Sequence, residues 1–252
     1  MSFVVAADAY GRFMGRYAEP LAAAFADYVE AAPGDRALDV GCGPGALTAQ
    51  LVRRLDASAV SAIDPSPPFV EALRVRLPGV DVRLGVAGDL PFADSSFDLT
   101  TAQLVVHFMP DPVAGLAEMA RVTRPGGTVA ACVWDHGGGG GPLAAFWQAV
   151  HDIDPAAPGE ADLPGTREGH LAQLCAAAGL REVSSRSLTI RVGFQTLEEW
   201  WEPYTLGVGP AGDYVAALSA PQRERLRDRC AELLPPAPFE ISAVAWCVRA
   251  KA

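Results

Sequence analysis

The chain of 252 residues is half hydrophobic and one-fifth charged, which suits one domain with a sizeable core. Its net charge of −10 argues against a nucleic-acid partner, because phosphate binding requires a basic face. Five cysteines, none in a C-x-x-C pair, predict neither a zinc site nor disulfides. No apolar run approaches the roughly 20 residues that cross a bilayer, and Met1 to Tyr10 lacks the parts of a signal peptide. We therefore expect a cytoplasmic protein with a small-molecule substrate and no membrane partner. The oligomeric state stays open.

The first predicted elements are one or two helices over residues 8–31, which carry an apolar stripe. Near their start lies Tyr10 to Tyr17, a segment rich in aromatic residues and arginine. We interpret residues 1–32 as an N-terminal lid, which either packs on the core or also covers a ligand.

An apolar run at Ala37 to Val40 leads into Gly41-Cys42-Gly43-Pro44-Gly45, and a helical pattern follows at once. This order predicts a strand, a glycine turn and a helix, the construction that brings backbone N–H groups close to a cofactor. Glycine suits the turn because it tolerates positive φ and has no side chain to keep a ligand away. The glycine spacing also fits the dinucleotide pattern G-x-G-x-x-G/A, with Asp64 at the distance of a ribose contact.

Asp39, two positions before the first glycine, separates two interpretations of this turn. A carboxylate there would repel a pyrophosphate and attract the ammonium group of S-adenosylmethionine (SAM). Opposite charges at ~4 Å gain roughly 4 kcal/mol at a surface-like dielectric, and like charges lose about as much. The sign of the charge therefore favours SAM over a dinucleotide.

The rest of the chain alternates strand and helix patterns, as α/β sheets do. Five consecutive glycines, 137–141, predict a flexible hinge. Ser219 and Gln222 fit a capping box at the start of a late helix. Further strands are predicted at 59–63, 80–84, 98–102, 128–133, 182–192 and 241–248, and helices from 67, at 112–124, 143–153 and 170–178, and from 219.

Four ordered motifs between Tyr10 and Val133 resemble the class I SAM-dependent methyltransferases. The branch includes ubiquinone/menaquinone C-methyltransferases and many small-molecule methyltransferases. The motifs are L-D-V-G-C-G-P-G (38–45), Ile63-Asp64, Leu90-Pro91-Phe92 followed by Ser96-Phe97-Asp98, and Arg121-Val-Thr-Arg-Pro-Gly-Gly127.

This resemblance implies an α/β, Rossmann-like fold: an open, mostly parallel seven-stranded sheet with helices on both faces. It implies a single methyltransferase domain over 1–252. The parts are a lid (1–32), a SAM-binding core (33–134) and substrate-side insertions of helices and loops (135–166 and 193–238).

The resemblance also implies where SAM, and its product S-adenosylhomocysteine, would bind. Tyr10 and Arg16 would close over the methionine end, where a guanidinium can hold a carboxylate in a bidentate fork. Asp64 would accept hydrogen bonds from both ribose hydroxyls. The alternative for Asp64 is a structural role, as a cap for the helix that begins near Pro67.

Adenine recognition is where the chain departs from the family, because Val86 stands where many relatives carry an acidic residue. The backbone of Ala87 and Gly88 could bind the ring edge, with Asp89 receiving the amino group. The full predicted cofactor set is Tyr10, Arg16, Asp39, Gly41, Cys42, Gly43, Asp64, Pro65, Ala87, Gly88, Asp89 and Gln103.

Catalytic candidates follow the fourth predicted strand, at the sheet edge where ligands of open parallel sheets bind. Gln103 would help to position the methyl group. His107 is the candidate general base, because its ordinary pKa lies near neutrality; alternatively it is a histidine hydrogen-bonded at a loop–helix junction. No metal is expected, since methyl transfer from a sulfonium needs none. The predicted substrate pocket consists of His107, Trp134, Trp200, Trp201 and Tyr204, with simple packing as the alternative for the last three.

The sequence therefore predicts a SAM-dependent methyltransferase that acts on an O, N or C atom of a small, partly apolar metabolite. One alternative is a SAM-binding relative with a cyclase or decarboxylase activity. An NAD-dependent dehydrogenase is disfavoured by Asp39 and by the absence of a recognisable Tyr-x-x-x-Lys. A pure binding module is disfavoured because it would leave the cofactor loop idle.

Overall fold

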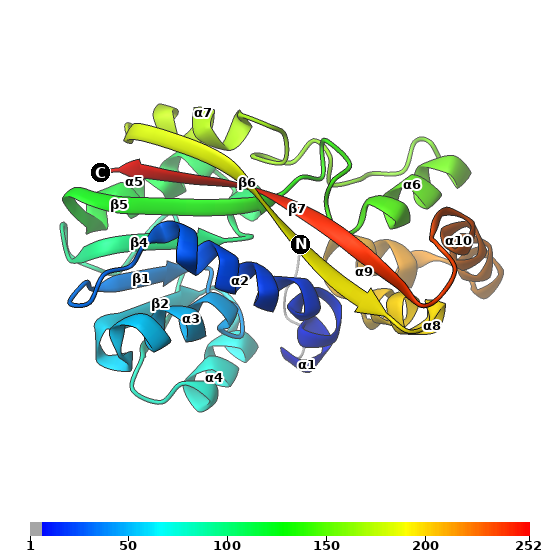
Figure 1. The fold of residues 1–252 in the computed structure, drawn as a ribbon, viewed down its shortest axis with the longest axis horizontal. Coiled ribbons are helices and arrows are strands. Elements are labelled where there is room, and N and C mark those ends of the chain that lie inside the picture. Colours follow the sequence, from blue (N-terminus) through cyan, green and yellow to red (C-terminus); the bar gives the residue numbers. More distant parts are fainter. Residues whose placement is uncertain (1–6) are drawn as a thin grey trace.

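Seven strands form one sheet in the computed structural model, which describes residues 7–252; the first six residues of the predicted lid lie outside this range. The order across the sheet is β3-β2-β1-β4-β5-β7-β6 (Figure 1). Only β7 runs antiparallel to its neighbours, β5 and β6. The predicted mostly parallel α/β fold is therefore confirmed. The strands are β1 (Ala37–Val40), β2 (Val60–Asp64), β3 (Asp81–Leu84), β4 (Phe97–Gln103), β5 (Thr123–Trp134), β6 (Arg181–Phe194) and β7 (Phe239–Lys251).

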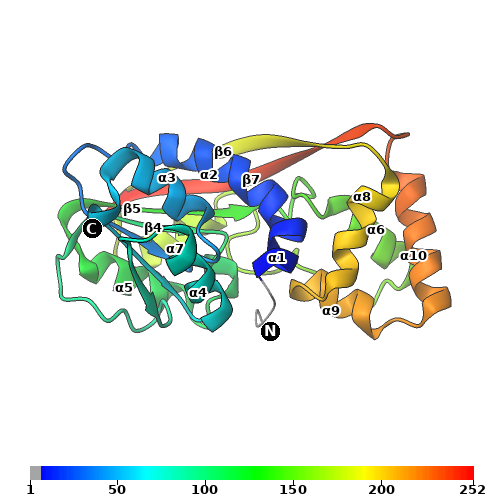
Figure 2. The ribbon, with the colours of Figure 1, turned by 90° about the horizontal axis from the view of Figure 1, so that it is seen from below.

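Helices cover both faces of this sheet (Figures 1 and 2). Alternate residues of a strand point to opposite faces, so Ala37 packs into one core and Leu38 into the other. Among the described residues, no helix is both long and apolar enough to cross a membrane. One face is covered by α2 (Arg16–Val29), α3 (Ala46–Leu55) and α4 (Pro67–Arg76), and the other by α5 (Pro112–Val122) and α7 (His170–Ala177). Two short turns complete this part of the chain: η2 (Ala57–Ala59) precedes β2, and η3 (Val106–Phe108) follows β4.

Strands β6 and β7 extend past the other strands and carry a helical unit at their far end (Figures 1 and 2). This unit corresponds to the predicted insertion at 193–238. The predicted capping box of Ser219 and Gln222 is confirmed at the start of its last helix. The unit consists of α8 (Leu197–Trp201), η4 (Glu202–Leu206), α9 (Gly209–Ala217) and α10 (Ala220–Leu233), and α6 (Ala144–Ile153) packs against α10.

The N-terminal helical segment runs from α2, on one face of the sheet, to α1, which lies between the sheet and the helical unit (Figure 2). It consists of α1 (Ala7–Tyr10), the π-helical turn η1 (Gly11–Gly15) and α2, which agrees with the helices predicted over 8–31. Phe13 packs edge-on against Tyr204 of η4, with ring centroids 5.1 Å apart. The segment thus connects the two parts of the molecule through aromatic contacts.

The glycine run at 137–141 wraps around the side chain of Asp135, so the predicted flexible hinge was wrong. The Asp135 Oδ1 atom accepts hydrogen bonds from the Gly138 N–H and the Trp246 Nε1–H, each at 2.9 Å. A Cβ atom at Gly138 would lie 2.5 Å from this oxygen, a separation that real Cβ atoms do not adopt. Glycine is required here because the turn closes tightly on a carboxylate.

Candidate functional site

The glycine turn between β1 and α3 has the backbone geometry that its sequence predicts. Gly41, Gly43 and Gly45 have φ values of 69°, 52° and 93°, which L side chains rarely adopt. A Cβ atom at Gly41 would lie 2.4 Å from the Val105 side chain, whereas one at Gly43 would meet nothing within 4 Å. Gly41 is thus fixed by packing, and Gly43 leaves open space beside its backbone.

Asp64, the last residue of β2, connects its strand to the glycine turn. Its Oδ2 atom accepts a hydrogen bond from the Gly43 N–H, and its Oδ1 atom accepts one from the Ser66 N–H, both at 2.8 Å. Burial raises the pKa of this carboxyl, and the two N–H donors oppose that rise. Ser66, not Asp64, is the N-cap residue of α4. Asp64 therefore orders the loops around it while its side chain also lines a cavity.

Asp39 is buried in the sheet and does not line that cavity. Its Oδ2 atom accepts a hydrogen bond from Thr48 Oγ1 at 2.7 Å, and its Oδ1 atom has no partner among the described residues. Burial raises the pKa of this carboxyl to about 7, although the Thr48 hydrogen bond opposes the rise. The sequence suggested that Asp39 attracts the ammonium group of SAM directly. Because Asp39 does not reach the cavity wall, the structure gives this direct contact no support.

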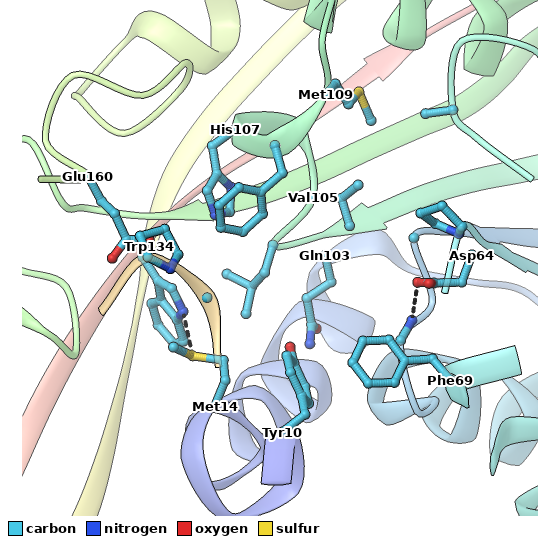
Figure 3. Close-up of a pocket in the computed structure, with 18 of the residues that line it drawn as sticks. Tyr10, Met14, Asp64, Phe69, Gln103, Val105, His107, Met109, Trp134 and Glu160 are labelled. Carbon is cyan, nitrogen blue, oxygen red and sulfur yellow. Dashed lines mark hydrogen bonds between the residues drawn. The ribbon is translucent and has the colours of Figure 1, made fainter. Parts of the chain in front are cut away.

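The cavity has a volume of about 520 Å³ and lies at the carboxyl ends of β1, β2 and β4 (Figure 3). This volume is within the usual range for small-molecule sites. Asp64 and Phe69 lie at one end, and Trp134 and Glu160 lie at the other (Figure 3). Tyr10 packs edge-on against Phe69, with ring centroids 5.2 Å apart. The remaining predicted residues that line the cavity are Gly41, Gly43, Pro65, Ala87, Gly88, Gln103 and His107.

Gln103, the last residue of β4, and His107 of η3 lie between the two ends (Figure 3). The Gln103 Nε2 atom donates to the Ala18 carbonyl at 3.1 Å, while its Oε1 atom has no partner within residues 7–252. The His107 side chain is buried, and its Nδ1 atom likewise lacks a partner in the described chain. Burial, with His136 nearby, holds the pKa of His107 well below its ordinary value. The imidazole is therefore neutral at physiological pH.

The Trp134 end of the cavity combines aromatic walls with one buried acid. The Trp134 Nε1–H donates to Met14 Sδ at 3.3 Å. Glu160 Oε2 accepts a hydrogen bond from the Trp147 Nε1–H at 2.8 Å, and the Glu160 side chain lines the cavity. Burial raises the pKa of this carboxyl to about 7.

Comparison with known proteins identifies the family. Residues 38–131 match a family model described as a methyltransferase domain. A stretch of 136 residues is 40% identical to an uncharacterized methyltransferase of Mycobacterium tuberculosis, covering 54% of this chain and 52% of that protein. Residues 38–131 therefore carry a methyltransferase domain, as the resemblance to the class I SAM-dependent methyltransferases implies. The family predicted from the ordered motifs is confirmed, and SAM is the cofactor of this family.

Two further similarities agree with this assignment. The chain is 42% identical over 101 residues to a demethylmenaquinone methyltransferase of Beutenbergia cavernae, covering 40% of this chain and 41% of that one. The chain thus spans about half, or less, of the length of the curated relatives that it matches. The solved structure of the YcgJ protein from Bacillus subtilis has the same fold, with a TM-score of 0.57 at 17% identity over 93% of this chain and 97% of that one.

Several predicted cofactor residues lie outside the cavity. The Arg16 guanidinium pairs with the Glu199 carboxylate at 2.5 Å and lies 4.5 Å from the centroid of the Phe194 ring. The Arg16 guanidinium therefore forms an ion pair between α2 and α8 and does not face the cavity. Cys42 is buried in the loop, and Asp89 follows the Val86–Gly88 stretch without lining the cavity.

The aromatic cluster of the insertion also differs from its predicted place. Trp200, Trp201 and Tyr204 are buried and are not among the residues that line the cavity. Tyr204 stacks on Phe146 of α6 with ring centroids 4.5 Å apart. The cluster forms the core of the helical unit, so packing is the interpretation that its contacts favour.

The sequence did not identify Glu160 or His136 as cavity residues. Glu160 lies in a loop rich in proline and glycine, where no periodic pattern indicates which side chains turn inward. His136 lies two residues after Trp134, the end of β5. Because Trp134 was predicted to line the pocket, this closeness in the sequence could have indicated His136 as well.

Proposed function

We propose that this methyltransferase transfers the methyl group of SAM to a small, partly apolar acceptor. One observation carries the proposal: a single cavity reaches from Asp64 beside the glycine turn to the aromatic end at Trp134. Donor and acceptor can share this space, which direct transfer of a methyl group requires.

The residues at the Asp64 end fit the adenosyl part of SAM. After its two backbone hydrogen bonds, the Asp64 carboxylate still has lone pairs that two ribose hydroxyls could use. The open space beside Gly43 allows a ligand to approach the backbone. Pro65, Ala87 and Gly88 would line the same site, and Tyr10 would cover it.

When bound, SAM supplies a methyl group on a positively charged sulfur. The chain itself then has to hold two molecules in line, and such positioning can be worth roughly 7–11 kcal/mol of the barrier. Gln103 lies between the two ends of the cavity and would help to orient the reacting groups. His107 lines the cavity with a neutral imidazole whose Nδ1 atom has no partner in the described chain, and this nitrogen would accept the proton that an O, N or C acceptor loses.

The charges of the cavity support an acceptor without phosphate or carboxylate groups. No Lys or Arg is among the described residues that line it, whereas Asp64, Asp111 and Glu160 are. Apart from the sulfonium of SAM, an anionic acceptor would find no opposite charge among the described residues that line the cavity. The cytoplasmic location and the lack of a nucleic-acid partner stay predictions from the sequence.

The first test is calorimetric binding of SAM, S-adenosylhomocysteine and NAD to purified protein from which any bound ligand has been removed. We expect both adenosyl compounds to bind and NAD not to bind. NAD binding without SAM binding would contradict the proposal.

The second test follows the label from methyl-labelled SAM while an acceptor library is screened. We expect labelled product together with S-adenosylhomocysteine. SAM binding and acceptor turnover without S-adenosylhomocysteine release would instead favour the cyclase or decarboxylase alternative.

A further inference from the structure

Glu160 is a buried acid at the cavity end opposite Asp64 (Figure 3). Only 4% of the residue is exposed. It lies in the loop between α6 and α7, so it belongs to the predicted insertion at 135–166 and not to the SAM-binding core. The adenosyl group would occupy the other end, which leaves Glu160 facing the acceptor.

The charge of Glu160 is poorly compensated by the chain. Among the described residues, its carboxylate receives one hydrogen bond, from a neutral donor, the Trp147 Nε1–H. No ion pair joins it to a Lys or Arg in the part of the chain that the structure describes. A buried carboxylate with one neutral donor is costly to ionise. A ligand that brought a positive charge would remove that cost.

The surroundings of Glu160 favour a cation over other ligands. The cavity walls offer no Lys or Arg to an anion. His107 and His136, whose ring centroids are 6.2 Å apart, are both neutral because burial lowers their pKa values. Trp134 adds an aromatic wall at this end, and aromatic faces attract ammonium groups.

The geometry points to Glu160 as the residue that selects the acceptor: it binds the ammonium group of an apolar amine inside the cavity. Calling that amine the methyl acceptor rests on the proposed function, but the binding of the amine does not. Glu160 here is a specificity residue. The atom that receives the methyl group can be another atom of the molecule, or the amine nitrogen after the ammonium group has given a proton to His107, because an ammonium nitrogen has no lone pair.

The experiment uses three probes of one shape: 2-phenylethylamine, 2-phenylethanol and phenylacetate. Their dissociation constants are measured by calorimetry on the full chain with S-adenosylhomocysteine bound, at a pH above the pKa of Glu160 and below that of the amine. We expect the amine to bind at least about tenfold more tightly than the alcohol, and phenylacetate to bind most weakly. Equal affinities, tighter phenylacetate binding or no amine binding at millimolar concentration would overturn the inference.

Glu160→Gln keeps the shape of the side chain, and its amide oxygen can still accept from Trp147. We expect this variant to bind the amine at least about tenfold more weakly and the alcohol within about twofold of the native protein. Asp162→Asn is the matched control, because Asp162 lies in the same loop with 89% of its side chain exposed. It should retain the preference for the amine. An unchanged preference in Glu160→Gln would also overturn the inference.

Two further measurements keep the outcomes separate. The wild-type series alone tests the inference if Glu160→Gln fails to fold. The titrations are repeated without S-adenosylhomocysteine. If the protein does not bind S-adenosylhomocysteine, that result counts against the proposed function, and the preference for the amine measured without it still tests the role of Glu160.

Discussion

The two ends of the cavity are built in different ways. At the Asp64 end, the residues come from consecutive strand–loop–helix units, and Gly43 and Asp64 are joined by a direct hydrogen bond. At the Trp134 end, they come from distant parts of the chain, such as Met14, Trp134 and Glu160. The first end is thus defined by local backbone geometry, whereas the second exists only after the whole chain has folded.

The two ends also compensate their buried acids differently. Asp64 accepts two backbone N–H groups, while Glu160 accepts one side-chain N–H. The Asp64 end, whose carboxylate already accepts two backbone hydrogen bonds, suits a cofactor that does not change. The Trp134 end, where the Glu160 carboxylate lacks an ion-pair partner, suits an acceptor that brings a positive charge. The predictions below test this contrast.

The largest effect is expected at the glycine turn, from Gly41→Ala. The new Cβ atom would combine a φ of 69° with a clash against Val105, which together cost about 2–4 kcal/mol of unfolding free energy. SAM affinity should fall by about 100-fold or more, because the turn must shift.

Gly34→Ala is the control: its φ is 95°, but it has open space and lies away from the cavity. It should lose about 1 kcal/mol of stability and no SAM affinity. Similar SAM affinities for both variants would contradict the packing argument.

His107→Asn tests the middle of the cavity. We expect kcat to fall about 100-fold with little change in SAM affinity, because the neutral imidazole would no longer accept a proton. His136→Asn is the matched control, since His136 also lines the cavity and is neutral. Single-turnover rates at saturating acceptor measure the difference. Near-normal turnover in His107→Asn would leave His107 with a structural role only.

Asp64→Ala should weaken SAM binding by about 1–3 kcal/mol, the usual scale for leaving buried polar groups unpaired. Asp89→Ala should leave the affinity within about twofold, because Asp89 does not line the cavity. Calorimetric titration of both variants, with thermal melts to check folding, gives the comparison. If Asp89→Ala loses affinity as well, adenine recognition reaches further along the chain than the cavity wall indicates.

The smallest effect concerns the pH dependence of stability. Burial raises the pKa of Glu160 from 4.5 in the unfolded chain to about 7, so the folded state holds its proton more tightly. The stability from this proton is fully present below about pH 4 and is lost as pH rises through about 7. Glu160→Gln should therefore gain about 1–2 kcal/mol relative to the native protein between about pH 6 and pH 8, without ligands. Denaturant unfolding of both proteins at the two pH values measures this gain. If the difference in unfolding free energy between the variant and the native protein did not change with pH, the raised pKa of Glu160 would be contradicted.

Local patterns in the sequence predicted the Asp64 end because its geometry is local. The strand, the glycine turn and the acid at the end of β2 each follow from a few neighbouring residues, and the structure has them as predicted. The positions of Arg16 and of Trp200 could not be predicted in this way. A guanidinium or an indole in the sequence does not reveal whether it faces a cavity or, as here, Glu199 and the core of the helical unit. Glu160 has no local signal at all, since its burial depends on α6 packing beside its loop.

The place of β7 has a consequence for the synthesis of the chain. β7 is made after both β5 and β6, yet it lies between them in the sheet and is the partner of both. At about 5–20 residues per second, the ribosome needs roughly 3–11 seconds to make the residues from the end of β6 to the end of β7. During this time the nascent chain exposes two open strand edges, which invite pairing with other chains. Productive folding of this chain therefore depends on keeping β5 and β6 from pairing with strands of other chains until β7 has been made.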